Sequence, residues 1–305
     1  MKGLGPWSVA VDQPSALGES PFWHPHEQML YWLDIPGRAV RRANVFMGTV
    51  QTWALAQDPG CMAPATGGGL VLALRDGIYR AREWGGPLTL LAPLPGDPLR
   101  LRFNDGKADP MGRFWAGTYA EQKITPDAAL YCLDPECGGL QAMHAGFFTS
   151  NGLAWSPDAR TLYWADTQGH QILGWDWDAA SNTLGTQRLL RSFAPRPEGW
   201  RAGQAGYGGR PDGAAVDQEG NYWSAQYEGA RLLKLSPQGE VLAEFAVPAQ
   251  CPTMPCFGGD DGQTLYLTTA RAGRPADELE RLPLSGCVFS MRVDVPGLPV
   301  NFFSG

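Results

Sequence analysis

The chain has 305 residues, of which 44% are hydrophobic and 18% charged, so it can build a packed core and lacks the composition of a disordered protein. A net charge of -7 without any cluster of lysines and arginines argues against nucleic-acid and anionic-membrane partners, because both need a concentrated basic face. The 39 glycines and 26 prolines are spread along the whole chain, which is typical of many short strands joined by turns.

The first twenty residues lack the continuous apolar segment of a signal peptide, and no apolar run is long enough to span a bilayer. We therefore expect a cytoplasmic protein whose six cysteines are free thiols. Cys132/Cys137 and Cys251/Cys256 have the spacing of some zinc loops, but a structural zinc site usually has two such pairs in matching surroundings. A structural zinc site is therefore disfavoured.

Segments rich in aromatic and β-branched residues recur along the chain and predict strands. In chain order they are MLYWLDI (29–35), GLVLALRDGIYRA (69–81), GRFWAGTY (112–119), TLYWADT (161–167), NYWSAQY (221–227) and TLYLTTA (264–270). Short polar turns precede most of them: HPHEQ (24–28), DPMGR (109–113), SPDAR (156–160), DQEGN (217–221) and GDDGQ (259–263). A hairpin that recurs at roughly 45 to 60 residues fits four-stranded propeller blades. The pattern predicts an all-β, six-bladed β-propeller that forms a single domain over residues 1–305.

Four oxygen-bearing side chains precede the strand tryptophans at related distances. Glu19 and Asn151 lie thirteen residues before Trp32 and Trp164, and Asn104 and Asp212 lie eleven before Trp115 and Trp223. Because strand side chains alternate with a period of two, we expect all four at equivalent positions in different blades. Singly, each Asn-Gly or Asp-Gly pair is an ordinary turn signal, but four in register indicate a ring of oxygens around the central channel.

Two carboxylates and two amides without a basic partner would suit a hard divalent cation with oxygen ligands. Three or four protein ligands leave coordination sites open for water or substrate, as metal-assisted hydrolysis requires. Oxygen ligands of this kind leave calcium, magnesium, manganese, zinc and ferrous iron as open alternatives.

Five longer segments carry a recognisable pattern: LGESPFWHPHEQMLYWLDI (17–35), RFNDGKADPMGRFWAGTYAEQ (102–122), TSNGLAWSPDARTLYWADT (149–167), RPDGAAVDQEGNYWSAQY (210–227) and CFGGDDGQTLYLTTAR (256–271). Together they closely resemble the regucalcin/gluconolactonase family, also called the senescence marker protein family. The resemblance implies a six-bladed propeller with one divalent metal in its channel. It also implies hydrolysis of a small sugar-acid lactone, and we expect the enzyme to be a monomer.

The same resemblance assigns roles to individual residues. It places Glu19, Asn151 and Asp212 on the metal, and Arg102, Asn104 and Glu121 on the substrate. Asp212 is also the candidate catalytic base, although a carboxylate bound to a metal is a weakened base. Where the family often has Met-Ala-Glu after its Gly-Thr pair, this chain has Tyr119-Ala120-Glu121, so the wall beside the glutamate differs.

Two features stand outside this pattern. The segment PRPEGWRAGQAGYGGRPDG (195–213) is longer than the resemblance implies, and it is either a loop over the channel mouth or a plain surface loop. His24 and His26 lie in a predicted turn, where we expect them to be solvated.

Two other functions remain open on the sequence. One is a non-enzymatic propeller that binds a divalent metal or a ligand, since the fold serves many functions. The other is a phosphotriesterase-like hydrolase that uses the same kind of ring. A catalytic serine is disfavoured, because there is no G-x-S-x-G motif.

Overall fold

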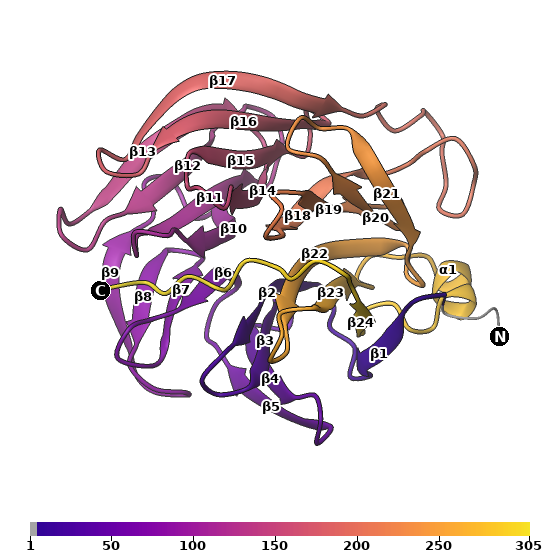
Figure 1. Cartoon of the computed structure of the whole chain (residues 1–305), viewed down its shortest axis with the longest axis horizontal. Coiled ribbons are helices and arrows are strands. Elements are labelled where there is room, and N and C mark those ends of the chain that lie inside the picture. The colour runs from indigo at the N-terminus through magenta and orange to yellow at the C-terminus, as the bar shows by residue number, and fades with distance from the viewer. Residues whose placement is uncertain (1–4) are drawn as a thin grey trace.

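The computed structural model describes residues 5–305, and its strands form six four-stranded antiparallel sheets around a central axis (Figure 1). Within each sheet the strands are given from the axis outward. The first sheet contains β2 (Gly18–His24), β3 (Met29–Asp34), β4 (Ala39–Asn44) and β5 (Thr49–Ala54). The second contains β6 (Pro59–Pro64), β7 (Leu70–Leu74), β8 (Gly77–Ala81) and β9 (Leu88–Pro93), and the third contains β10 (Leu101–Ala108), β11 (Phe114–Ala120), β12 (Ala128–Leu133) and β13 (Leu140–Phe147). The next two are β14 (Ser150–Trp155), β15 (Thr161–Asp166), β16 (Gln171–Asp178) and β17 (Thr183–Ser192); and β18 (Arg210–Val216), β19 (Tyr222–Tyr227), β20 (Arg231–Leu235) and β21 (Val241–Ala246). The prediction of an all-β, six-bladed propeller is confirmed.

The sixth sheet combines the last three strands of the chain with its N-terminal strand. It contains β22 (Cys251–Gly258), β23 (Thr264–Ala270), β24 (Val288–Arg292) and the N-terminal strand β1 (Ser8–Val11), which pairs with β24. The six-residue helix α1 (Ala276–Arg281) lies in the connection between β23 and β24. Within residues 5–305 no helix is long and apolar enough to cross a membrane.

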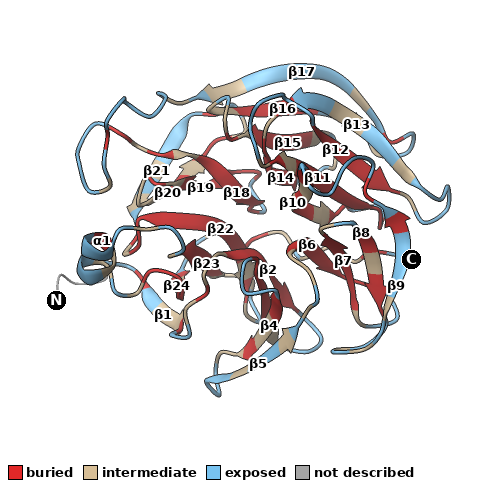
Figure 2. Ribbon diagram, turned by 180° about the vertical axis from the view of Figure 1, so that it is seen from behind, coloured by how far each residue is buried: buried red, intermediate tan, exposed pale blue. Residues whose placement is uncertain are grey.

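Burial follows the order of the strands within each blade. The inner and middle strands are mostly buried, whereas the outermost strands β5, β13, β17 and β21 carry most of the exposed positions (Figure 2). Trp32, Trp115 and Trp164 are fully buried in the second strands of their blades. Each donates its indole N–H to a side chain, so these large residues pack without leaving a buried donor unpaired.

The predicted strand over 69–81 is in fact two strands. β7 ends at Leu74 and β8 begins at Gly77, with Leu74 opposite Gly77 across the turn at Arg75 and Asp76. Asp-Gly is a tight-turn signal, and it interrupts an apolar run that otherwise resembles one long strand.

The C-terminal segment after β24 crosses one end of the ring (Figure 1). It forms backbone bridges at Asp217↔Gly297 and Ala65↔Phe303, and so connects the fifth blade with the second. Its Phe302 ring packs edge-on against His24, with ring centroids 5.5 Å apart. The expectation of a solvated His24 is therefore wrong, because this side chain is buried at the end of β2, whereas His26 is exposed. All six cysteines are free, as expected.

Candidate active site

The innermost strands that carry the four predicted oxygen-bearing residues break register at the same level. The breaks fall between Glu19 and Phe22 in β2, Phe103 and Gly106 in β10, Asn151 and Ala154 in β14, and Pro211 and Ala214 in β18. Each break is a β-bulge, in which two residues of the inner strand lie opposite one residue of its neighbour. Bulges of this kind redirect side chains, and they occur beside active sites.

The four residues do not occupy one equivalent position, which corrects the prediction from their spacing. Glu19 and Asn151 are the last paired residues before the bulge, whereas Asn104 and Asp212 are the first residues within it.

The hairpins explain this shift of one residue. In the hairpins of Glu19 and Asn151, the first residue pair beyond the bulge joins residues nine apart in sequence, as in Phe22↔Tyr31. In the hairpins of Asn104 and Asp212 that pair joins residues ten apart, as in Gly106↔Ala116. The tryptophans from which the spacing was counted also differ, since Trp32 lies opposite its bulge and Trp115 lies two residues before that position. A shift of one residue would normally turn a side chain to the other face of the sheet. Here the residues after Glu19 and Asn151 have left-handed backbones, with φ of 49° at Ser20 and 63° at Gly152, which locally redirects the chain.

The two asparagines meet across a blade boundary. Asn104 Nδ2 donates to Asn151 Oδ1 at 2.9 Å and to the Ser150 carbonyl at 3.0 Å. Asn151 Nδ2 donates to Thr167 Oγ1 at 2.8 Å, and that hydroxyl donates to the Pro211 carbonyl at 2.8 Å. These bonds fix the Asn151 amide with its oxygen toward Asn104, and they link the third, fourth and fifth blades.

The carboxylates of Glu19 and Asp212 are both buried, at 9% and 6% exposure. Burial, and then the charges of Asp212 and Asp105, raise the pKa of Glu19 well above its usual value. Burial and the charge of Asp105 raise the pKa of Asp212, and the positive charge of Arg210 opposes this rise. Asp105 Oδ2 accepts from the Leu153 N–H at 3.1 Å, whereas its buried Oδ1 has no hydrogen-bond partner among residues 5–305.

This donor set fits a hard divalent cation, although the described residues contain no group of three or more His, Cys, Asp and Glu side chains that could hold a metal by themselves. Glu19 and Asp212 make no ion pair with any residue in the described part of the chain, and the charges of Arg102 and Arg210 only partly offset the cost of burying the two carboxylates together. A cation would neutralise both, and the Asn151 oxygen would add a neutral third ligand.

Arg102 lies beside this group on β10. Its Nη1 donates to the Phe103 carbonyl and to Asn104 Oδ1, both at 2.9 Å, and its guanidinium lies 4.8 Å from the centre of the Tyr119 ring. Glu121 is 3.7 Å from Arg102, but both of its oxygens accept from Arg75, at 2.9 and 3.2 Å. Arg102 and Asn104 therefore form one unit, and Glu121 lies behind Arg102 as part of an ion-pair network.

The segment before β18 packs on itself and on the fifth blade. Trp200 and Tyr207 are buried, with their rings edge-on at 5.0 Å, and Trp200 Nε1 donates to the Gln204 carbonyl at 3.1 Å. Arg196 pairs with the buried Glu228 at 3.2 Å.

Sequence reasoning did not single out Thr167, and it considered Arg210 only as part of the segment before β18. Thr167 directly follows β15, and its hydroxyl joins the Asn151 side chain to the Pro211 carbonyl of the fifth blade. Arg210 stands two residues before Asp212, as Arg102 stands two before Asn104, and this repeated Arg-x-Asn/Asp pattern is visible in the sequence.

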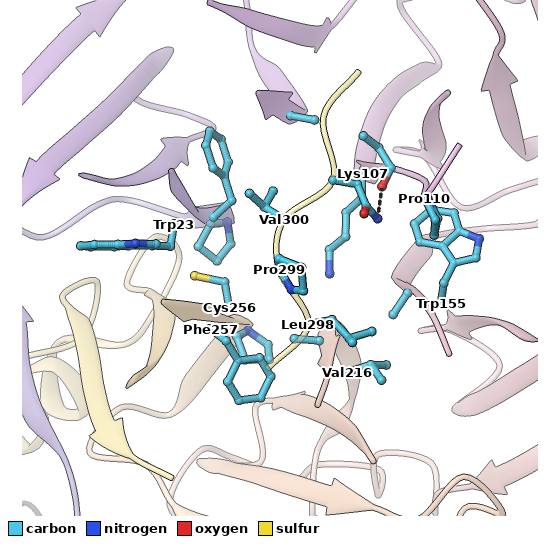
Figure 3. A pocket seen from close by; sticks show the side chains of 18 of the residues that line it. Trp23, Lys107, Pro110, Trp155, Val216, Cys256, Phe257, Leu298, Pro299 and Val300 are labelled. Carbon is cyan, nitrogen blue, oxygen red and sulfur yellow. Dashed lines mark hydrogen bonds between the residues drawn. The ribbon is translucent and has the colours of Figure 1, made fainter. Parts of the chain in front are cut away.

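A separate cavity of about 300 Å³ lies at the other ends of the innermost strands (Figure 3). Trp23, Trp155 and Phe257 line it together with Val300 of the C-terminal segment. Lys107 extends into it, and its ammonium donates to the Ala214 carbonyl. The cavity begins at the β2 bulge, since Ser20 and Pro21 line it, whereas Glu19, Asn151 and Asp212 do not.

Residues 17–271 match the SMP-30/Gluconolactonase/LRE-like region family. The chain is 44% identical to 6-deoxy-6-sulfogluconolactonase of Pseudomonas putida and 32% identical to regucalcin of Danio rerio, with 97% of each chain covered in both cases. Its fold is similar to the crystal structure of regucalcin from Agrobacterium tumefaciens, described as a calcium-binding protein, with a TM-score of 0.88, 26% identity and 97% of each chain covered. The match over most of the chain and the shared fold show that this protein belongs to the SMP-30/gluconolactonase family.

Proposed function

We propose that the protein hydrolyses the lactone of a sugar acid with the help of one divalent metal ion. The observation that carries the proposal is the pair of buried carboxylates, Glu19 and Asp212, which form no ion pair among residues 5–305 and raise each other's electrostatic cost. The hydrogen-bonded amide of Asn151 would add a neutral oxygen. Membership of a lactonase family supports the reaction class. The calcium-binding regucalcin with the same fold supports a divalent cation.

Glu19, Asn151 and Asp212 would hold the metal. When bound, it would supply Lewis acidity that favours attack on the lactone carbonyl. The Asp212 carboxylate would accept the proton of the attacking water.

Arg102 and Asn104 would bind the substrate oxygens. A guanidinium has only donors and cannot coordinate a cation, so its place beside the site suits hydrogen bonds to sugar hydroxyls. Its bonds to Phe103 and Asn104 hold it in a single orientation, which lowers the entropic cost of positioning the lactone. The name of the Pseudomonas relative adds a sulfonated gluconolactone to the aldonolactones to be tested.

Lactone hydrolysis followed in a pH-stat, before and after chelation, tests the proposal. Asp212→Ala should retain the fold and reduce kcat/KM by more than tenfold, or more than ~1.4 kcal/mol, because it removes a ligand and the base together. Asp158→Ala is the matched control, because that carboxylate lies in an exposed turn and bonds only to the local turn residues Ser156 and Arg160.

Three results would contradict the proposal. If Asp212→Ala keeps more than a tenth of the wild-type kcat/KM, the catalytic assignment is wrong. If no lactone is hydrolysed and metal still binds, the protein is a binding module. Faster turnover of paraoxon than of any sugar lactone would identify a phosphotriesterase-like hydrolase.

A further inference from the structure

Arg210 repeats the arrangement of Arg102 in another blade. Arg102 lies opposite Tyr119 across β10 and β11, and Arg210 lies opposite Tyr227 across β18 and β19. The two guanidiniums lie 4.8 Å and 5.1 Å from the centres of these rings. The third and fifth blades therefore present the same arginine-on-tyrosine unit.

Both units stand at the same height relative to the candidate site. Each arginine precedes a residue of the bulge by two positions, and two steps along a strand return a side chain to the same face about 7 Å away. An arginine side chain can span that distance, and the charge of Arg210 acts on the Asp212 carboxylate. Arg210 is thus within reach of a molecule bound at the bulges.

Arg102 and Arg210 differ in their exposure and in the hydrogen bonds and ion pairs that they form. Arg102 is 12% exposed and donates hydrogen bonds to Phe103 and Asn104. Arg210 is 21% exposed, and its ion pair is to Glu228 at 3.3 Å. Arg210 is therefore the more available of the two.

The ion-pair network around Arg210 has more cations than anions. Three arginines, Arg196, Arg210 and Arg274, pair with Glu228, and among residues 5–305 the one further carboxylate in these ion pairs is Glu278. Glu278 accepts two bonds of 2.8 Å from Arg274, which leaves the buried Glu228 to balance the other two arginines. The charges of these five side chains sum to +1, and the further carboxylate on which Arg210 acts, Asp212, would be neutralised by the proposed metal ion.

We propose that Arg210 forms an anion subsite at the channel mouth, which receives a sulfonate, phosphate or carboxylate substituent on the lactone. This inference rests on the proposed lactonase function and defines its substrate class. A guanidinium has five N–H donors, and Arg210 stacks on Tyr227 and places Nη1 3.3 Å from Glu228, so its other N–H groups can meet two oxygens of one oxyanion. A neutral hydroxymethyl group at the same place would leave the extra positive charge unbalanced.

The test compares glucono-1,5-lactone with the same ring carrying a 6-sulfonate or a 6-phosphate. The wild type should prefer an anionic lactone, and this preference should weaken as the ionic strength rises. Arg210→Gln should lose at least tenfold in kcat/KM on the anionic lactone, mainly through KM, because the group it binds is remote from the reacting carbonyl. The loss on glucono-1,5-lactone should be smaller, because there only the effect of the Arg210 charge on Asp212 is removed. Arg210→Lys keeps the positive charge but cannot donate two parallel hydrogen bonds to one oxyanion, so its kcat/KM on the anionic lactone should lie between those of the wild type and Arg210→Gln.

Arg231→Gln is the matched control. Arg231 lies in the same blade, is 24% exposed, pairs with Glu244 at 2.8 Å and also donates to the Gly208 carbonyl in the segment before β18. It should change neither rate by more than about threefold, since exposed ion pairs contribute little. Arg210→Gln should fold normally, because Glu228 keeps Arg196 and Arg274 as partners.

Calorimetric binding of gluconate and 6-sulfogluconate, to wild type and Arg210→Gln, separates this inference from the proposed function. If no lactone is hydrolysed but the wild type alone prefers the sulfonated acid, the subsite stands and the lactonase proposal fails. Equal losses on neutral and anionic lactones would overturn the subsite, and so would a wild type with no preference in either assay. The sulfonate and phosphate arms identify which oxyanion fits.

Discussion

Thr167 links two blades at the candidate metal centre through one hydroxyl group. It accepts from Asn151 Nδ2 and donates to the carbonyl of Pro211, the residue before Asp212. Its side chain is buried, so neither bond is exchanged with bulk water. Thr167 therefore acts as a positioning residue for one predicted ligand and for the strand that carries another.

Thr167→Val should weaken metal binding by about ten- to a hundred-fold without removing a ligand, since partners of ligands have effects of that size. The valine keeps the shape but leaves the Asn151 Nδ2 unpaired, so the amide loses the bond that fixes its orientation. Titration of Ca²⁺ and Mn²⁺ by calorimetry measures the effect. Thr167→Ser keeps the hydroxyl and should bind as the wild type does. Equal affinity in the valine variant would show that Asn151 needs no support from Thr167.

At the scale of the strand, the bulges explain why the sequence predicts the identity of the site residues better than their register. The spacing of Glu19 and Asn104 from the strand tryptophans suggests one common position. Their true positions differ by one, because the two hairpins differ in length by one residue. The spacing conceals this difference, since Trp32 and Trp115 stand at different positions relative to the bulges. Left-handed backbone at Ser20 is equally hidden, since serine is not a residue that signals it.

Gly152 gives a test of the bulge itself. Its φ is 63°, and a Cβ there would lie 2.2 Å from the Tyr222 hydroxyl and 3.1 Å from the Asp212 carbonyl. Gly152→Ala should lower the free energy of unfolding by about 2 to 4 kcal/mol, because it combines backbone strain with a clash in a packed region. Urea denaturation followed by tryptophan fluorescence measures it.

Gly199→Ala is the matched control for Gly152→Ala. Gly199 has a similar φ of 69°, but a Cβ there would have no atom within 4 Å. It should cost only the strain, about 1 kcal/mol. Equal losses in the two variants would mean that the bulge tolerates a side chain and that close packing at Gly152 is unimportant.

At the scale of the whole molecule, the sequence predicts the blades but not how the ring closes. Hairpins such as 24–35 and 156–167 can be predicted from local sequence, because a polar turn is followed directly by a run of aromatic and β-branched residues. β1 and β24 pair although they lie near opposite ends of the chain, and the local sequence of neither strand indicates which strand it pairs with. The burial of His24 could not be predicted for the same reason, because it depends on contact with Phe302 in the C-terminal segment, and the sequence around His24 does not indicate that contact.

We propose that residues 1–305 form a single domain, and ring closure makes this testable. β1 supplies the outermost strand of the sixth blade, and Trp7 beside it is buried, packs edge-on against Phe289 and donates to the Ala246 carbonyl at 2.7 Å. Removing residues 1–11 would expose the edge of β24 and the apolar surface that Trp7 covers, and an open sheet edge promotes association between chains. In calorimetry the full chain should unfold in one transition whose calorimetric and van't Hoff enthalpies agree, because each blade is stabilised by its two neighbours.

Trp7→Ala should keep that single transition and lower the free energy of unfolding by about 3 to 5 kcal/mol, the usual cost of emptying a buried tryptophan site. The shortened chain should lose more than this and should aggregate on heating, since it loses the closing strand as well as Trp7. Two well-separated transitions in the full chain would contradict a single domain. A shortened chain as stable as Trp7→Ala would show that the tryptophan, and not the pairing of β1 with β24, holds the ring closed.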